Sequence, residues 1–349
     1  MDGAVAGPGG SSAATGSVPS LVLPWVESPF FRRELAARTP HLSDEQRSLA
    51  EQFHTRGFVA VPGAVPAALC DQVRAEVEPM FEDEETAARR RVQDAWKTGA
   101  VAVRELATYP PILGILELLY ERRPVPFQTL DFKWGTEQRG HSDSVHFSCL
   151  PARFMCGVWV ALEEVDRSNG PLFYYPGSHR LPEITGYDLG FTAAEHFYPR
   201  YEDFQHELMG ELGIAPVEFY AAKGDVLVWS SNLVHGGRPV HRPGSTRWSQ
   251  VSHYFFDGCI YYQPHSSEIP LGNLLLLDVT DLTTLERVEP TYNGQPVAVH
   301  RQPGGLSHLT IDDGSGVVVP PPAPRQRGSW RRRASWLSRR LVPRPQAGS

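Results

Sequence analysis

The sequence predicts a mostly β fold with flanking helices, arranged as an antiparallel sandwich or barrel. The middle of the chain consists of short aromatic and β-branched segments separated by Gly, Pro, Asn and Ser, which is typical of such folds. The expected strands are residues 126–134, 143–149, 154–162, 171–175, 225–230 and 247–256. A chain of 349 residues with 41% hydrophobic side chains is long enough to enclose a substantial core.

Helices are expected ahead of these strands. Residues 43–46 read Ser-Asp-Glu-Gln and fit a capping box, so the first helix begins there, and Gly57 ends it. Residues 58–61 follow as a short strand. A second helix starts near Pro66 and a third covers about residues 111–120, each with its apolar residues on one face.

Composition divides the chain into three parts. Residues 1–30 are expected to form a flexible arm, because small residues and Pro dominate most of it. Residues 31–312 form the folded domain, and within it residues 182–222 interrupt the strand pattern, as a lid or substrate-binding insertion does. Residues 313–349 are Pro- and Arg-rich and are expected to be a disordered tail, in which residues 330–341 have the pattern of a basic amphipathic helix.

The charge of the chain is unevenly distributed. The formal net charge is −7, yet residues 321–349 hold eight Arg and no acidic residue, so the remainder carries all 40 acidic side chains and 25 of the 33 basic ones. An acidic body argues against a nucleic-acid-binding core. We interpret the basic tail as a solvated run, with contact to an acidic partner or a membrane surface as the alternative.

The cysteines and the apolar runs bear on location. Cys70, Cys149, Cys156 and Cys259 are scattered without a C-x-x-C pair, and we interpret them as reduced, small apolar residues of a cytosolic protein. The first residues lack the basic and apolar regions of a signal peptide, and no run approaches the roughly 20 apolar residues of a membrane helix. A cytoplasmic protein without a transmembrane segment is therefore expected.

His141, Asp143 and His235 are the candidate metal ligands. On an extended strand the side chains of residues 141 and 143 point to the same side. His235 arrives from elsewhere, after a buried strand that begins near Asp225. Two imidazoles and one carboxylate on one face of a metal ion leave three positions open, which is the facial triad of non-haem Fe(II) oxygenases. A single histidine is more often structural, so the combination carries the prediction.

Arg247 is the candidate anion-binding residue. Arg247, Ser249, Val251 and His253 share one face of a strand, and if that face lines a barrel, the guanidinium is a buried cation. Either an acidic side chain elsewhere neutralises it, or a dicarboxylic acid cosubstrate does, since a planar guanidinium binds a carboxylate through two hydrogen bonds. His253 lies farther along and is expected to pack in the core.

Two more histidines need a role. His146 lies five residues after His141, so a continuous strand would place it on the opposite face. We favour contact with the substrate or support of the ligands over metal binding for His146. His179 lies in a Pro-Gly-Ser-His turn and is expected to make a structural hydrogen bond.

An ordered series of motifs accompanies these residues. They are residues 141–147 (His-Ser-Asp-Ser-Val-His-Phe), 157–162 (Gly-Val-Trp-Val-Ala-Leu), 169–172 (Asn-Gly-Pro-Leu), 176–179 (Pro-Gly-Ser-His), 224–229 (Gly-Asp-Val-Leu-Val-Trp) and 235–236 (His-Gly). In order and spacing, this series resembles the phytanoyl-CoA dioxygenase-like family of Fe(II)/2-oxoglutarate oxygenases, over roughly residues 43–257. The resemblance implies a double-stranded β-helix (jelly-roll, cupin-like) core.

The resemblance also implies a site and a reaction. Fe(II) would bind the residues that match the family's ligands, His141, Asp143 and His235. Such enzymes consume 2-oxoglutarate and O₂, release succinate and CO₂, and hydroxylate a small organic substrate. Relatives that halogenate lack the carboxylate, so Asp143 favours hydroxylation or a related desaturation.

The cosubstrate residues follow in the same way. The resemblance places the distal carboxylate of 2-oxoglutarate on Arg247, and Trp159 and Thr129 match positions that contact this cosubstrate. Two alternatives stay open, a non-redox metal-dependent enzyme on the same scaffold and a non-catalytic jelly-roll binding protein. Arg247 argues against the first, and the complete set of three ligands argues against the second.

Overall fold

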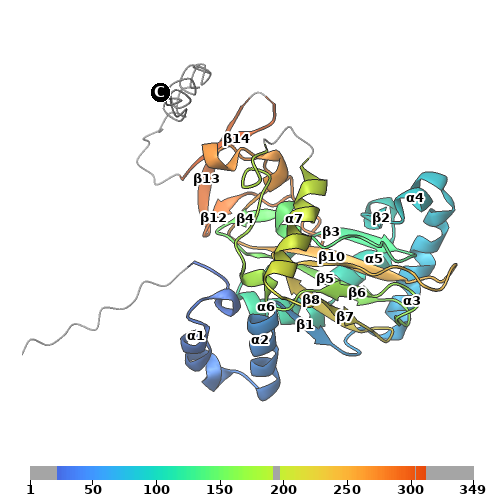
Figure 1. The fold of residues 1–349 in the computed structure, drawn as a ribbon. Coiled ribbons are helices and arrows are strands. Elements are labelled where there is room, and N and C mark those ends of the chain that lie inside the picture. Colours follow the sequence, from blue (N-terminus) through green and yellow to red (C-terminus); the bar gives the residue numbers. More distant parts are fainter. Residues whose placement is uncertain (1–21, 192–196, 303, 312–349) are drawn as a thin grey trace, which may run out of the picture.

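The computed structural model describes residues 22–191, 197–302 and 304–311. Its largest sheet has six antiparallel strands in the order β1-β8-β5-β10-β3-β2 (Figure 1). These strands are β1 (Phe58–Val61), β2 (Val92–Gln93), β3 (Pro124–Phe132), β5 (Met155–Ala161), β8 (Val226–Ser230) and β10 (Ser249–Phe256). Four of the six expected strands lie in this sheet; the expected strand at 171–175 forms as β6 (Leu172–Tyr174) in a second sheet, and residues 143–149 form a strand only in part.

A shorter antiparallel sheet, in the order β7-β6-β9, packs against the inner face of the large one. Its strands are β6 (Leu172–Tyr174), β7 (Val217–Phe219) and β9 (His235–Gly237), and a further pair joins β4 (Ser148–Leu150) to β11 (Ile260–Tyr262). Contact between the sheets includes the rings of Trp159 and Phe219, whose centroids lie 5.8 Å apart. Two facing antiparallel sheets around one interior are the arrangement of a jelly roll.

Helices cover the outer face of the large sheet. The helices α2 (Asp44–Arg56), α3 (Ala67–Val77), α5 (Val101–Ala107) and α6 (Pro110–Tyr120) contribute to one core cluster. Val158 and Val228 belong to this cluster, whereas their neighbours Trp159 and Trp229 belong to the cluster between the sheets. Because side chains alternate along a strand, β5 and β8 are buried on both faces, and the residues that point inward can form a site.

The remaining elements lie around this core. The other helices are α1 (Phe31–Arg38), α4 (Glu84–Arg89) and α7 (Tyr198–Glu211), and a last sheet consists of β12 (Thr291–Tyr292), β13 (Gln295–Arg301) and β14 (Ser307–Ile311). Short 3₁₀ helices are η1 (Trp25–Glu27), η2 (Thr39–His41), η3 (Glu78–Glu82), η4 (Ala95–Thr98), η5 (Asp143–Val145), η6 (Ser178–Arg180), η7 (Pro264–Ser266) and η8 (Ile269–Leu271). Among the described residues, no helix combines the length and the apolar composition that crossing a membrane requires.

The predicted first helix has the expected ends. The Ser43 side chain accepts from the Gln46 backbone N–H at 3.1 Å, and the Gln46 side chain accepts from the Ser43 N–H at 2.9 Å, so the capping box forms. Gly57 ends the helix with a φ of 82°. A Cβ there would lie 2.5 Å from Nδ1 of His179, so this position needs glycine for its conformation and for its space.

Three expectations differ from the structure. Residues 143–149 are not one strand, because a 3₁₀ turn precedes β4. The stretch 1–30 is not wholly an arm, since Trp25 and Val26 are buried. The stretch 182–222 contains α7 but ends in β7, which is a strand of the core sheet. The predicted tail, residues 313–349 with the helix over 330–341, lies outside the described residues.

Candidate metal centre

His141 and His235 meet although they are distant in sequence. Their backbones form an antiparallel bridge, in which each N–H donates to the other's carbonyl at 3.0 and 2.9 Å. Their ring centroids lie 4.6 Å apart. The loop before η5 therefore aligns with β9, and this pairing brings the two imidazoles side by side at one end of the small sheet.

Both imidazoles leave Nε2 available to a metal ion. The Nδ1 of His141 lies 2.9 Å from the Arg139 carbonyl oxygen, and the Nδ1 of His235 lies 2.9 Å from that of Leu233. A carbonyl only accepts, so each Nδ1 carries the proton and each Nε2 a lone pair. The Gln138 amide, 3.2 Å from the Nε2 of His141, donates to that lone pair and has to turn away when an ion binds.

Asp143 supplies the third ligand atom. Its Oδ1 lies 4.0 Å from Nε2 of His141 and 3.8 Å from Nε2 of His235, and all three ligand atoms lie within 4.8 Å of one another. Ser142, between the two ligands, is extended at φ −113° and ψ 147°, which turns both side chains to one side as the strand argument predicted.

The protonation states suit metal binding. Burial, together with the nearby imidazole of His235, lowers the pKa of His141 to about 3, so the ring is neutral at physiological pH. Burial on its own raises the pKa of the Asp143 carboxyl, but the surrounding imidazoles, His235 first, outweigh it and hold that pKa well below its usual range. Neutral imidazole and anionic carboxylate are the forms that coordinate metals.

The second oxygen of Asp143 is held by other residues. The indole Nε1 of Trp229 donates to Oδ2 at 2.7 Å. Nε2 of His253 lies 3.6 Å from the same oxygen, while its Nδ1 lies 2.9 Å from Oε1 of Gln128. Gly157 makes room for this arrangement, because a Cβ there would lie 2.3 Å from the Trp229 ring. Oδ1 is left to face the two imidazoles, which fits one-oxygen coordination.

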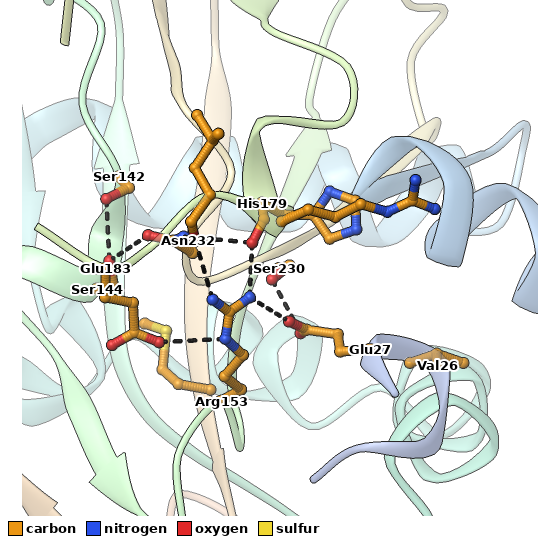
Figure 2. A network of polar contacts seen from close by, with 12 residues as sticks. Val26, Glu27, Ser142, Ser144, Arg153, His179, Glu183, Ser230 and Asn232 are labelled. Atoms are coloured by element: carbon orange, nitrogen blue, oxygen red, sulfur yellow. Dashed lines mark hydrogen bonds and ion pairs between the residues drawn. The ribbon is translucent and has the colours of Figure 1, made fainter. Parts of the chain in front are cut away.

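Hydrogen bonds hold the loop that carries Asp143 on both sides, and Figure 2 shows the side toward Asn232. The hydroxyls of Ser142 and Ser144 lie 2.9 Å apart, and Ser144 donates to Oδ1 of Asn232 at 2.9 Å. The Asn232 amide donates to the Leu181 carbonyl at 2.7 Å. On the other side, the Ser142 hydroxyl lies 2.7 Å from that of Tyr201 in α7. The metal-ligand loop is thereby fixed to the segment after β8 and to α7.

The half-buried guanidinium of Arg153 extends this network toward the start of the described chain (Figure 2). Arg153 donates to Oε2 of Glu27 at 3.1 Å and to the His179 carbonyl at 2.6 Å, and its Nε lies 3.5 Å from Oε1 of Glu183. Ser230, at the end of β8, donates to the other Glu27 oxygen at 2.9 Å. The segment that the sequence predicts as an arm, residues 1–30, therefore contains a residue that supports the site, Glu27.

A cavity of about 480 Å³ opens beside the three ligands. Its lining includes all three of them together with Arg247 and Trp159. The other lining residues are Arg91, Gln93, Gln128, Leu130, Phe132, Thr136, Gln138, His146, Phe147, Leu172, Tyr198, Trp229, Gly236, Val251, His253, Gln263 and His265. A volume of this size suits small-molecule ligands.

Arg247 is a buried cation without a partner of opposite charge. Its side chain is 1% exposed, forms no ion pair with a described residue, and makes one hydrogen bond, at 3.4 Å to the Gly170 carbonyl. Burial lowers the pKa of Arg247 to about 10, so it stays charged at neutral pH. Glu163, whose negative charge partly offsets the lowering of this pKa, accepts hydrogen bonds from Trp248 and Thr246. The guanidinium therefore fits an anionic ligand in the cavity.

The structure separates the two other predicted cosubstrate residues. Trp159 lines the cavity, and its ring centroid lies 5.9 Å from the Arg247 guanidinium carbon. Thr129 does not line it, so the expectation that Thr129 contacts a ligand there is wrong. On β3 the cavity is lined by Gln128, Leu130 and Phe132, and strand alternation places Thr129 on the opposite face, where its backbone N–H donates to Asp94 at 3.0 Å.

Other site residues were missed or misjudged from the sequence. His253 is not simply core packing, because it lines the cavity beside Asp143. His146 lines the same cavity as His141 rather than the opposite face, because the 3₁₀ turn η5 rotates the chain between them. Ser249 shares the face of Arg247, and its buried hydroxyl has no hydrogen-bond partner. His179 does make the expected structural bond, with Nε2 lying 3.1 Å from the His54 carbonyl.

Comparison with known proteins supports the resemblance over the core. A family model described as phytanoyl-CoA dioxygenase (PhyH) matches residues 125–247. A probable phytanoyl-CoA dioxygenase of Caenorhabditis elegans is 29% identical over 126 residues, 35% of this chain and 37% of that protein. The peroxisomal phytanoyl-CoA dioxygenase of Rattus norvegicus is 29% identical over 127 residues, 35% of this chain and 34% of that protein. The chain thus spans little more than a third of the length of the curated relatives it matches.

A solved structure shows the same fold. The non-heme alpha ketoglutarate dependent epimerase SnoN from nogalamycin biosynthesis superposes with a TM-score of 0.50 at 24% identity, covering 65% of this chain and 89% of that one. Sequence identity at this level speaks for the fold alone. The matched stretch, residues 125–247, includes the three ligands and reaches Arg247. Residues 125–247 are therefore similar to phytanoyl-CoA dioxygenases, and the chain has the double-stranded β-helix fold that its motifs predicted.

Proposed function

We propose that the chain is an Fe(II)- and 2-oxoglutarate-dependent dioxygenase that hydroxylates a small organic substrate and releases succinate and CO₂. One observation carries the proposal. Three ligand atoms of the facial-triad type open into the same cavity as Arg247, a buried guanidinium with no acidic partner among the described residues. A metal-binding scaffold without a keto-acid cosubstrate has no use for that cation, which argues against a non-redox enzyme and a binding protein.

Each residue has a separate task in this proposal. His141, Asp143 and His235 hold Fe(II), which when bound supplies O₂ activation coupled to oxidative decarboxylation of 2-oxoglutarate. Arg247 binds the distal carboxylate of the cosubstrate, and Trp159 covers it within the cavity. Trp229 keeps Asp143 in its one-oxygen orientation. The protein thus binds, orients and excludes water, while the iron carries the oxidation.

Hydroxylation is favoured over other outcomes by the intact carboxylate ligand. With Asp143 in place, no coordination position is freed for a halide. The neighbour named above is an epimerase, so the same fold also serves a reaction that adds no hydroxyl group. The alternative to hydroxylation is therefore another hydrogen-abstraction outcome such as desaturation or epimerisation, and mass analysis of the product separates them, since only hydroxylation adds one oxygen atom.

The first experiment is anaerobic titration of the Fe(II)-loaded chain with 2-oxoglutarate. The expected result is the metal-to-ligand charge-transfer band that a chelated keto acid produces, followed by succinate release on admitting O₂. Asp143→Ala should lose both, because the ion loses its anionic ligand, whereas Asp203→Ala, an exposed residue of α7, should keep both. No band in the wild-type chain at saturating iron and cosubstrate would refute the proposal.

We also propose how the function is placed in the chain and the cell. The catalytic unit corresponds to residues 31–312, with support from Glu27 just before it. Its four cysteines are free and buried, which suits a reducing compartment and hence the cytoplasm. Fractionation of cells that produce the tagged protein tests the location.

A further inference from the structure

The cavity has two chemically different ends. Around Arg247 the lining is mainly apolar, with Phe132, Trp159, Leu172 and Val251 from the cluster between the sheets. Toward the segment before β2 it is polar and carries the side chains Arg91, Gln93, Gln128, His146, Tyr198, Gln263 and His265. If the inner end takes 2-oxoglutarate, as proposed above, the polar end is left for the substrate.

Arg91 brings a positive charge to this polar end without an acidic partner. Arg91 is an exposed residue at the cavity and forms no ion pair with any described residue, whereas its neighbour Arg90 lies 3.4 Å from Oε1 of Glu137. Arg91 and His146 both line this cavity. Burial lowers the pKa of His146 to about 4, and the positive charge of Arg91 is a smaller cause in the same direction.

His146 adds an unused hydrogen-bonding group beside that charge. Neither of its ring nitrogens has a hydrogen-bond partner in the described part of the chain, although the ring is half-buried, against the ring of Tyr198 at 5.0 Å between centroids. His265, at 5.5 Å, has its Nδ1 engaged with the Val145 carbonyl at 3.3 Å. A half-buried ring that lines a cavity and has no hydrogen-bond partner among the described residues is placed to bind a ligand there.

The acidic side chains of the lining do not balance Arg91. Asp143 is the single carboxylate among the lining residues, and it is committed to the two imidazoles and Trp229. In the proposed complex, the two carboxylates of the cosubstrate are taken by the metal ion and Arg247. Arg91 then remains as the one uncompensated charge among the lining residues, at the polar end of the cavity.

We propose that Arg91 and His146 form a specificity site for an oxyanion of the substrate, a carboxylate or a phosphate, in a small polar molecule. The proposal rests on the function proposed above and names the class of its substrate. Arg91 attracts and orients the anion, and His146 donates a hydrogen bond to it. The polar amides and the tyrosine around them favour a compact polar substrate over a long unbranched hydrocarbon chain, for which this end of the cavity offers few apolar contacts.

The test is a binding comparison on the full chain loaded with Ni(II), which is inert toward O₂, and 2-oxoglutarate. Three probes of similar size are titrated by calorimetry: phenylacetate, phenyl phosphate and the neutral phenylacetamide. At least tenfold tighter binding of one anion than of the amide is expected, and the stronger anion identifies the preferred oxyanion. Arg91→Gln should remove this preference, and His146→Phe, which keeps the ring, should weaken it severalfold.

Arg32→Gln, which removes an exposed arginine of α1 outside the cavity lining, is the matched control and should preserve the preference. Equal binding of amide and anions, absence of anion binding at millimolar concentration, or an unaltered preference in Arg91→Gln would overturn the proposal. Failure of the proposed function is recognised separately, because the Fe(II)-loaded wild-type chain would then give no charge-transfer band with 2-oxoglutarate.

Discussion

The indole N–H of Trp229 donates to Oδ2 of Asp143 at 2.7 Å, from the strand that faces the metal-ligand loop. This bond occupies one carboxylate oxygen and leaves the other for the ion. Trp229 itself fits because residue 157, opposite it in the β5–β8 register, has no side chain. A strand pairing thus determines how a metal ligand is oriented, and mutations of the strand should be visible in metal binding.

Removing the indole N–H of Trp229 should weaken metal binding while an aromatic ring still fills the space in the core. Trp229→Phe keeps an aromatic ring but frees Oδ2, so we expect Fe(II) affinity to fall by about 10–100-fold, the usual effect of losing such a supporting bond. Competition with a coloured chelator measures it. Trp96→Phe is the matched control, because the Trp96 N–H also contacts a carboxylate, Asp94, at 3.4 Å, but outside the cavity lining. Equal losses in both variants would contradict the role of Trp229.

A methyl group at residue 157 should displace the same indole. In Gly157→Ala the new Cβ would lie 2.3 Å from the Trp229 ring within two packed strands, so we expect destabilisation of about 1–3 kcal/mol together with weaker metal binding. Urea denaturation and the chelator assay measure the two effects. Gly114→Ala is the control. A Cβ there meets nothing within 4 Å, and alanine favours a helix more than glycine does, so the stability of this variant should stay the same or rise.

Arg247 should matter for the cosubstrate and not for the ion. Arg247→Gln removes a buried charge that would pair with a carboxylate, so we expect 2-oxoglutarate binding to weaken by about 2–4 kcal/mol, or roughly 30- to 1,000-fold. The affinity for Fe(II) should change little. The charge-transfer titration and the chelator assay report these quantities independently. An unaltered 2-oxoglutarate affinity would rule out this role for Arg247.

Acidification should destabilise the metal-free chain through its buried histidines. Burial lowers the pKa of His179 to about 3, below the ordinary value of 6.5, so the folded state resists a proton that the unfolded state accepts. The free energy of unfolding should therefore fall as the pH drops from about 6.5 toward 3, by up to about 1.4 kcal/mol per pH unit for this group. Urea denaturation at pH 7 and pH 5 measures it. Between these pH values, the free energy of unfolding of His179→Gln should fall less than that of the wild type. His206→Gln, which changes an exposed histidine, should lose as much stability as the wild type.

The parts of the site that the sequence predicts are those that depend on alternation and strand order. His141 and Asp143 are predicted together because they lie two residues apart on extended chain. Arg247 is predicted because it shares a strand face with Val251 and His253. The structure places all of these residues at the cavity, as alternation requires. His235 follows from the buried strand before it, which ends where the small sheet begins. These predictions depend only on the local sequence, and they hold because each segment adopts the regular extended conformation that they assume.

The errors arise where both faces of a strand are buried or where one turn intervenes. Thr129 is expected at the cosubstrate because it matches a family position, yet in this chain it lies on the helix-covered face of β3, which also holds the buried Asp131. His146 is displaced by a single 3₁₀ turn, which leaves no mark on hydrophobic periodicity. The pairing of Arg153 with Glu27 joins residues 126 positions apart, and only the tertiary structure reveals it.

Because Glu27 pairs with Arg153, the segment before residue 31 contributes to the structure of the domain, although its composition resembles that of a flexible arm. A shortened protein that starts at residue 31 would lose Glu27, and Arg153 would keep Glu183 alone as its acidic neighbour, in a largely enclosed position. Arg153 also donates to the carbonyls of residues 179 and 181, which accept from Asn232 as well, so the loss of Glu27 would act on the same hydrogen-bond network. A recombinant protein that begins at the apparent edge of the barrel would thus lack part of the hydrogen-bond network that supports the metal-ligand loop through Arg153 and Asn232.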